Sequence, residues 1–553
     1  MSSPPETEES TADLDVGTPH GGRLVAQALK ARGVTKLFSL SGGHLFSIYD
    51  GCKEEGIDVV DFRHEQAAGF AAIGWAKALR EPGVAALTAG CGVTNGMSAI
   101  ASAQADGVPI VVLGGRAPEM RWGSGSLQEI DHVPFVAPLV KSAETVREPA
   151  AIPEVTAGAI DLASTPPFGP TFVDYPLDVV FMEADATVPD PPAVSAVAAE
   201  GVDRAAQLLE GAERPVVMAG SNLYWSRAES ELRELVEALG IPVYLNGMGR
   251  GCLPPDNALF FSRSRGAALK DADVALVIGV PLDFRLGFGG AFGDQTQLIH
   301  LDVSPMELEK ARQPDLSLVG DIAASLTEIR EAAGPNSGAT DAWLASLREV
   351  ETEKIGEERE MLDDERSPLH PMRIYRELLD FLDRDAIVVG DGGDFVSFAG
   401  RVMETWQPGC WMDPGPYGCL GAGPGQAIGA KLAHPERQVC LLMGDGAFGF
   451  SAMEFDTMAR HDLPVVAVMG NNGIWGLEHH PMKFLYGYSL AAELRPETRY
   501  DEVVSALGCH GELVRSPDEL RPALERAFES GKPALVNVLC DPEIAYPRRA
   551  NLA

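Results

Sequence analysis

One stretch, Val439 to Trp475, constrains the fold more than any other part of the chain. It reads VCLLMGDGAFGFSAMEFDTMARHDLPVVAVMGNNGIW, an apolar run ending in Gly-Asp-Gly (444–446), a helical segment, and an apolar run ending in Asn471-Asn472. This pattern predicts strand, tight turn, helix and strand, and in a parallel βαβ unit both strand ends meet at one edge of the sheet. Carboxylate and carboxamide oxygens beside a helix N-terminus suit Mg²⁺ that holds a diphosphate. The stretch therefore predicts a cation and diphosphate site.

The Gly-Asp-Gly turn and the Asn pair 24 residues later resemble the diphosphate motif of thiamine diphosphate (ThDP) enzymes. The resemblance implies that Asp445, Asn472 and the carbonyl group of Ile474 bind Mg²⁺. It also implies that Gly446 and Ala447, together with Asn472 and Ile474, contact the cofactor. An aspartate in a glycine turn is more often only part of the turn, which is the structural alternative. The Asn pair at this spacing favours the cofactor site.

A second motif, HEQAAGFAA from His64, lies where a predicted strand (57–62) passes into a predicted helix. It resembles the segment of ThDP enzymes that carries the activating glutamate. Glu65 is thereby implied as the acid that engages the aminopyrimidine ring of the cofactor, while the cofactor supplies the organic chemistry. The structural alternative is a glutamate that interacts favourably with a helix N-terminus.

Glycine-rich segments supply further implied cofactor contacts. Gly418-Cys419-Leu420-Gly421 resembles the family segment that enforces the bent cofactor, with Leu420 as the wedge between the rings and the Gly418 carbonyl as an acceptor for the 4′-amino group. The alternative is a leucine in a glycine-rich turn of the core. The remaining implied contacts are the glycines after two predicted strands, Gly42, Gly43 and Gly392.

Composition excludes several classes of protein. The chain has 553 residues and a net charge of -36, which argues against a nucleic-acid surface. No apolar stretch is long enough for a membrane span, and the acidic start does not resemble a signal peptide. The eight cysteines form no CxxC pair, so reduced thiols in the cytoplasm are expected.

Apolar runs alternate with helical segments, which predicts an α/β fold with parallel sheets covered on both faces. The resemblance implies three doubly wound parallel-sheet domains, which bind the pyrimidine, a nucleotide and the diphosphate in that order. The predicted segments are a disordered acidic tail (1–19), the pyrimidine-binding domain (20–185), a linker (186–199), the central domain (200–345), a connector (346–369), the diphosphate-binding domain (370–541) and a C-terminal tail (542–553).

The central domain resembles the branch that contains acetolactate synthase, oxalyl-CoA decarboxylase and 2-hydroxyacyl-CoA lyase. The resemblance rests on Arg263-Ser264-Arg265 and on the segments 272–289 and 300–305. In this branch the domain holds FAD or the ADP part of coenzyme A. We expect Arg263, Arg265 and Arg285 to bind phosphates, and Asp302 to accept a hydrogen bond from a ribose hydroxyl. The alternative is that the arginines form surface ion pairs in an acidic protein.

Three further segments bear on the substrate. Ser126-Leu127-Gln128-Glu129 resembles a substrate-side Phe-Gln-Glu, so Gln128 is a candidate substrate contact and Leu127 leaves a roomier cavity. The basic tail with Arg548 and Arg549 is expected to fold over bound coenzyme A as a lid, with a frayed terminus as the alternative.

Glu493 is the first candidate for the general base, because Ala491, Ala492 and Leu494 flank it and apolar surroundings raise a carboxyl pKa. A helix-surface role is the alternative, and Glu478, His479 and His480 are the next candidates.

We therefore predict a ThDP- and Mg²⁺-dependent carbon–carbon lyase that cleaves a 2-hydroxyacyl-CoA to formyl-CoA and a ketone or aldehyde. The alternatives are acetolactate synthase with FAD, oxalyl-CoA decarboxylase, and a nucleotide-binding module without turnover. The family forms each site from the first and third domains of different subunits, so a homodimer is the minimum and a homotetramer is expected.

Overall fold

The computed structural model describes residues 18–193, 195–305, 312–334 and 338–547. Most of the predicted N-terminal tail lies outside the described residues, as do Arg548 and Arg549. None of the helices within the described ranges is both long and apolar enough to cross a membrane.

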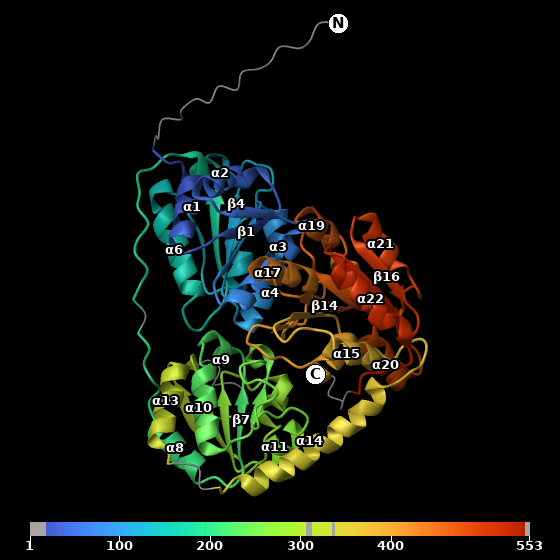
Figure 1. The fold of residues 1–553 in the computed structure, drawn as a ribbon. Helices are drawn as coiled ribbons and strands as arrows, with labels where there is room; N and C mark the ends of the chain where they lie inside the picture. Colours follow the sequence, from blue (N-terminus) through green and yellow to red (C-terminus); the bar gives the residue numbers. More distant parts are fainter. Residues whose placement is uncertain (1–17, 194, 306–311, 335–337, 548–553) are drawn as a thin grey trace.

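The chain folds into three parallel sheets that are covered by helices (Figure 1). The first and third sheets have six strands, and the middle sheet has five. The prediction of three parallel-sheet α/β domains is confirmed. Each sheet lies within one of the three predicted domain segments.

The first sheet has the order β2-β1-β3-β4-β6-β5. Its strands are β1 (Lys36–Ser39), β2 (Asp58–Asp61), β3 (Gly83–Leu87), β4 (Ile110–Arg116), β5 (Ala143–Thr145) and β6 (Thr171–Pro176). The helices around it are α1 (Gly21–Ala31), α2 (Phe46–Glu55), α3 (Glu65–Leu79), α4 (Cys91–Asp106), α5 (Val133–Val136), α6 (Ile152–Ala163) and α7 (Leu177–Phe181).

The middle sheet has the order β11-β10-β9-β7-β8. Its strands are β7 (Pro215–Ala219), β8 (Val243–Leu245), β9 (Val274–Ile278), β10 (Gln297–Asp302) and β11 (Leu316–Val319). Its helices are α8 (Val202–Glu210), α9 (Ser221–Trp225), α10 (Glu229–Leu239), α11 (Arg265–Asp271) and α13 (Ile322–Ala332).

The third sheet has the order β13-β12-β14-β15-β17-β16. Its strands are β12 (Ile387–Asp391), β13 (Trp411–Met412), β14 (Val439–Gly444), β15 (Val466–Asn471), β16 (His510–Val514) and β17 (Ala534–Leu539). Its helices are α15 (Pro371–Leu379), α16 (Asp394–Val402), α17 (Gly423–Ala433), α18 (Asp445–Ser451), α19 (Glu454–Arg460), α20 (Gly476–Tyr486), α21 (Tyr500–Ala506) and α22 (Pro517–Glu529).

β14 and β15 are parallel neighbours in the third sheet, and Gly444 pairs with Gly470. Both strands are buried along their length, as expected for apolar runs covered on both faces. The prediction that the Gly-Asp-Gly turn and the Asn pair meet at one sheet edge is therefore confirmed.

Most of the segment predicted as a connector (346–369) belongs to one helix, α14 (Asp341–Leu362), which runs from the middle domain toward the third (Figure 1). This helix is not exposed to solvent on all sides, because Glu351 and Glu358 are only 4% and 2% exposed. Glu351 accepts hydrogen bonds from the backbone N–H groups of Ser262 and Ser264. The helix is thus packed onto the middle domain.

The first and third sheets have the same strand order once their strands are renumbered from one. In this scheme α3 and α17 are equivalent crossover helices, and α4 is equivalent to the segment that begins with α18. The two equivalent helices α3 and α17 pack side by side between the domains (Figure 1).

Glycines let the backbones of α3 and α17 approach closely. A Cβ atom on Gly74 would lie 2.2 Å from the Gln426 carbonyl oxygen, and one on Gly429 would lie 2.2 Å from the Ala71 carbonyl oxygen. Distances this short are too close for any side chain, so both glycines are required by packing. This crossing fixes the first domain against the third.

We expect Gly429→Ala to destabilise the protein by about 1–3 kcal/mol, because the added methyl group forces the two helices apart. The matched control is Gly356→Ala in α14, where a Cβ meets nothing within 4 Å. Helix propensity makes this control neutral or slightly stabilising. Urea unfolding midpoints measure both effects, and an unchanged midpoint for Gly429→Ala would contradict the close crossing.

Candidate active site

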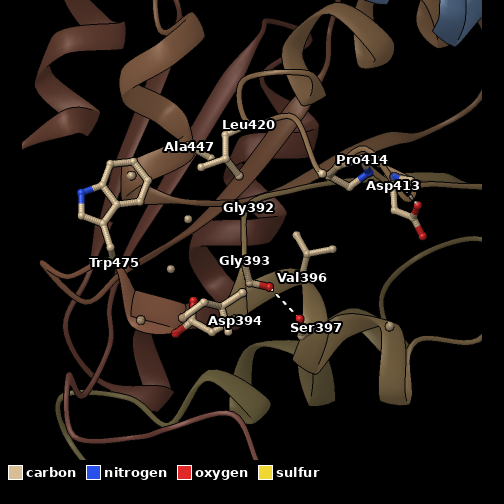
Figure 2. A pocket seen from close by; sticks show the side chains of 18 of the residues that line it. Gly392, Gly393, Asp394, Val396, Ser397, Asp413, Pro414, Leu420, Ala447 and Trp475 are labelled. Atoms are coloured by element: carbon tan, nitrogen blue, oxygen red, sulfur yellow. Dashed lines mark hydrogen bonds between the residues drawn. The ribbon is translucent and has the colours of Figure 1, made fainter. Parts of the chain in front are cut away.

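A cavity of about 550 Å³ lies at the carboxyl ends of the third domain's strands (Figure 2). It brings together the predicted cofactor and metal residues of this domain, which are Gly392, Gly418, Leu420, Asp445, Gly446, Ala447, Asn472 and Ile474. Figure 2 shows Trp475, Leu420 and Asp394 around the same hollow.

Asp445 begins α18 and is 3% exposed. Its Oδ2 accepts a hydrogen bond of 3.0 Å from the Gly473 N–H, so the carboxylate ties the end of β14 to the turn after β15. Burial raises the pKa of Asp445 to about 7, and backbone hydrogen bonds offset this only in part. A buried carboxyl at a cavity wall, bonded to a backbone N–H, suits a divalent cation as its counter-charge.

The two asparagines after β15 have different surroundings. Asn471 is 3% exposed and donates to the Thr498 carbonyl and the Asn537 side chain, so it holds the sheet edge together. Asn472 lines the cavity, and its Nδ2 is 3.4 Å from Asp394 Oδ2. Fixing the amide nitrogen in this way orients the carboxamide oxygen, the group that a cation would bind.

The glycine-rich loop that carries Leu420 is anchored by a residue that the sequence analysis missed. Asp391, at the end of β12, is fully buried and accepts hydrogen bonds from the N–H groups of Gly421 and Gly423 at 3.1 and 2.8 Å. Burial raises the pKa of this carboxyl to about 7. Gly421 has φ +78, which favours glycine. Asp391 therefore holds Leu420 at the cavity wall.

Asp394 and Trp475 also line the cavity and were not predicted. A Cβ atom on Gly446 would lie 2.5 Å from the Trp475 ring, so the ring covers the Gly-Asp-Gly turn directly. The only sequence signal for Asp394 was its place directly after Gly390-Asp391-Gly392-Gly393, a glycine-rich turn that follows a predicted strand.

The predicted residues of the first domain do not line this cavity in the single chain. Glu65 begins α3, is 6% exposed, and accepts a hydrogen bond of 3.1 Å from Asn95 Nδ2. Gln128 has φ +60, and its Nε2 lies 3.3 Å from Cys91 Sγ. Gly42 and Gly43 lie between β1 and α2. Within the described residues, every residue that lines the cavity comes from the second or third domain.

A second cavity of about 530 Å³ lies between the middle and third domains. Its basic lining residues are Arg250, Arg263, Arg265, Lys354 and Arg401. Its acidic lining residues are Glu357, Glu358, Glu404 and Asp413, and Tyr546 of the C-terminal segment contributes one wall. The two cavities are contiguous, because both are lined by Asn246, Gly247, Arg250, Ser397, Gly400 and Asp413.

The three predicted phosphate-binding arginines have different partners. Arg263 Nε forms an ion pair of 3.1 Å with Glu358, and Arg285 pairs with Asp283 at 2.6 Å. Both arginines therefore have acidic partners, but Glu358 is buried, so the Arg263 pair is not the surface ion pair of the alternative. The Arg265 side chain makes no hydrogen bond or ion pair within the described residues, and burial lowers the pKa of its guanidinium group.

Two other predicted residues have surroundings that the sequence analysis did not expect. Asp302 is fully buried, where its Oδ1 accepts hydrogen bonds from Asn222 Nδ2 and the Val303 N–H, and a bound ribose would have to reach it there. Glu493 is exposed and accepts a hydrogen bond of 3.3 Å from Ser489, so the expected apolar burial is absent in the single chain. The base role of Glu493 stays a prediction.

Family models of thiamine pyrophosphate enzymes match all three domains: the N-terminal TPP binding domain over residues 19–135, the central domain over 202–329 and the C-terminal TPP binding domain over 391–538. The chain is 58% identical over 551 residues to a probable acetolactate synthase of Mycobacterium bovis, covering 98% of this chain and 100% of that protein. It is 35% identical to 2-hydroxyacyl-CoA lyase 2 of Caenorhabditis elegans, covering 94% and 89%. It is 32% identical to 2-hydroxyacyl-CoA lyase of Arabidopsis thaliana, covering 96% and 98%.

The chain therefore belongs to the ThDP-dependent enzymes. Within this family it lies in the branch that includes acetolactate synthases and 2-hydroxyacyl-CoA lyases, as the sequence motifs indicated.

If Asp445 binds the cation as predicted, we expect Asp445→Ala to weaken Mg²⁺-dependent ThDP binding by about a hundredfold, because the cation would lose a carboxylate ligand at the cavity wall. Titration calorimetry of ThDP at fixed Mg²⁺ measures the change. The control is Asp518→Ala on the exposed start of α22, which should leave the affinity unchanged. Wild-type affinity in Asp445→Ala would rule out Asp445 as a ligand.

Proposed function

We propose that ThDP and Mg²⁺ bind in the first cavity, with the diphosphate at the start of α18. Asp445, the Asn472 carboxamide and the Ile474 carbonyl would hold the cation. The observation that supports this proposal is a buried carboxyl at the cavity wall beside an oriented carboxamide. Bound ThDP supplies a nucleophilic carbon that adds to a carbonyl group. The chain's own residues bind, orient and shield the cofactor.

For the reaction, our first candidate is acetolactate synthesis, in which one pyruvate loses CO₂ and its remaining two-carbon unit joins a second pyruvate. The observation that carries it is the 58% identity, along nearly the whole chain, to a protein named a probable acetolactate synthase. This ranking reverses the prediction from the sequence motifs, which placed the 2-hydroxyacyl-CoA lyase before acetolactate synthase. FAD would then occupy the second cavity.

The second candidate is cleavage of a 2-hydroxyacyl-CoA to formyl-CoA and a ketone or aldehyde. The contiguity of the two cavities favours it, because a substrate with a nucleotide at one end would occupy both. The ADP part would lie at Arg265, whose half-buried side chain lines the second cavity and makes no ion pair within the described residues. The acyl end would reach the cofactor past Arg250.

One set of assays separates the two candidates. A synthase is expected to form acetolactate and CO₂ from pyruvate, and bound FAD would add a yellow absorption band. A lyase is expected to release formyl-CoA from a short 2-hydroxyacyl-CoA, which mass spectrometry detects. Acetolactate without formyl-CoA would exclude the lyase, and the reverse result would exclude the synthase. If neither acetolactate nor formyl-CoA is detected, with 2-hydroxyacyl-CoA substrates of several chain lengths, both candidate reactions are contradicted.

We also propose that a second copy of the chain completes each site. Glu65 lies outside the cavity that contains Asp445 in the single chain, although both domains carry parts of the cofactor motif. The matching strand orders of the first and third domains fit a two-fold arrangement in which two such sites form together.

A mixing experiment tests the shared site. Glu65→Gln and Asp445→Ala homodimers should each be inactive. Random subunit exchange should restore about one quarter of wild-type activity, because each mixed dimer has one site with both residues intact. No recovery after exchange shown by mass spectrometry would place both residues in the site of one chain.

A further inference from the structure

A buried histidine–aspartate pair lies in the first domain, away from the residues that line the cofactor cavity. His132 and Asp174 have side chains that are 1% and 0% exposed, and His132 Nδ1 is 2.8 Å from Asp174 Oδ2. His132 Nε2 accepts a hydrogen bond of 2.9 Å from the Gly90 N–H. Because a backbone N–H can only donate, Nε2 carries no proton in this arrangement and Nδ1–H donates to Asp174. The pair thus presents a fixed acceptor to Gly90.

Gly90 is the N-cap residue that precedes α4, and it packs against the turn that carries Gln128. Gly90 has φ +63, and a Cβ atom there would lie 2.7 Å from the Gln128 carbonyl oxygen. The Sγ atom of Cys91, the next residue, lies 3.3 Å from Gln128 Nε2 and accepts its hydrogen bond. The position of Gln128 therefore depends on where the first turn of α4 lies.

Asn95, one turn further along α4, makes the hydrogen bond to Glu65. The start of α4 thus touches the predicted activating acid Glu65 through Asn95 and the predicted substrate-side residue Gln128 through Cys91. α4 follows β3 in the first sheet as α18 follows β14 in the third, so this helix start is the counterpart of the one that carries Asp445.

We propose that the His132–Asp174 pair is a positioning device that sets the first turn of α4, and through it the side chains of Glu65 and Gln128. Arg116 supports the pair, because its Nη1 donates to Asp174 at 3.3 Å and to Asp131 at 3.0 Å. A buried carboxylate held between a guanidinium group and an imidazole N–H has a defined orientation. This inference rests on the proposed role of Glu65 and is independent of the choice between synthase and lyase.

The test uses the substrate-free protein with ThDP and Mg²⁺. Glu65 is proposed to activate the cofactor, so the rate of deuterium exchange at the thiazolium C2 atom reports its position without any substrate. We expect His132→Phe to slow this exchange by about tenfold or more, because displacing a catalytic group slightly has large effects on rate. The ThDP dissociation constant should change by less than about threefold, because the diphosphate is bound by the third domain.

Two further variants separate loss of the acceptor from loss of packing. His132→Gln should keep exchange within about threefold of wild type, because a carboxamide can accept from Gly90 and donate to Asp174. Asp174→Leu should slow the exchange as His132→Phe does, since His132 Nδ1–H then has no acceptor and the imidazole ring is no longer oriented toward the Gly90 N–H.

The matched control is Tyr175→Phe, one residue from Asp174 on the same strand. It removes a buried hydrogen bond of 2.7 Å to Thr156, and Tyr175 packs in a different hydrophobic cluster from the buried apolar residues of α4. We expect exchange at the wild-type rate despite a comparable fall in thermal unfolding temperature.

Equal slowing by Tyr175→Phe, or a wild-type rate in His132→Phe, would overturn the positioning role. A wild-type protein that binds ThDP without accelerating exchange would overturn the proposed role of Glu65, and with it this inference.

Discussion

The close crossing of α3 and α17 is the contact on which the arrangement of the proposed site depends. α3 begins at Glu65, and α17 begins three residues after Leu420, so the crossing fixes the starts of two functional segments relative to each other. Gly74 and Gly429 remove the side chains that would separate the helices. Because the two helices hold equivalent places in sheets of the same strand order, their contact relates the first and third domains as a pair.

The carboxyl groups at and next to the first cavity have surroundings that differ from those of the acidic residues on the protein surface. The chain has a net charge of -36, whereas Asp391 and Asp445 are buried and Asp394 is half-buried, and burial raises the pKa of all three carboxyl groups. Backbone N–H groups are among the partners of all three. Such acids either bind protons or balance a cation, and at Asp445 the open cavity wall suits the cation.

Contacts could be predicted from the sequence where chain connectivity forces two residues together. They could not be predicted where the partner comes from a distant segment. Asp445 and Asn472 meet because a parallel βαβ unit brings its strand ends to one edge. No such rule linked Arg263 to Glu358, which lies 95 residues away on α14. The local neighbours of Glu493 are apolar, yet its side chain is exposed, since packing depends on the fold and not on adjacent residues.

The sequence by itself determined the family and the parallel α/β class, and it predicted residues of the third domain that the structure brings to one cavity. These depend on local spacing, strand periodicity and turn chemistry, which are properties of short segments. Only the tertiary structure decided which groups are buried, that Asp391 anchors the Leu420 loop, that the two cavities are contiguous, and that His132 contacts the start of α4. Each depends on segments that are far apart in the chain, and their contacts are set by the packing of whole helices and sheets.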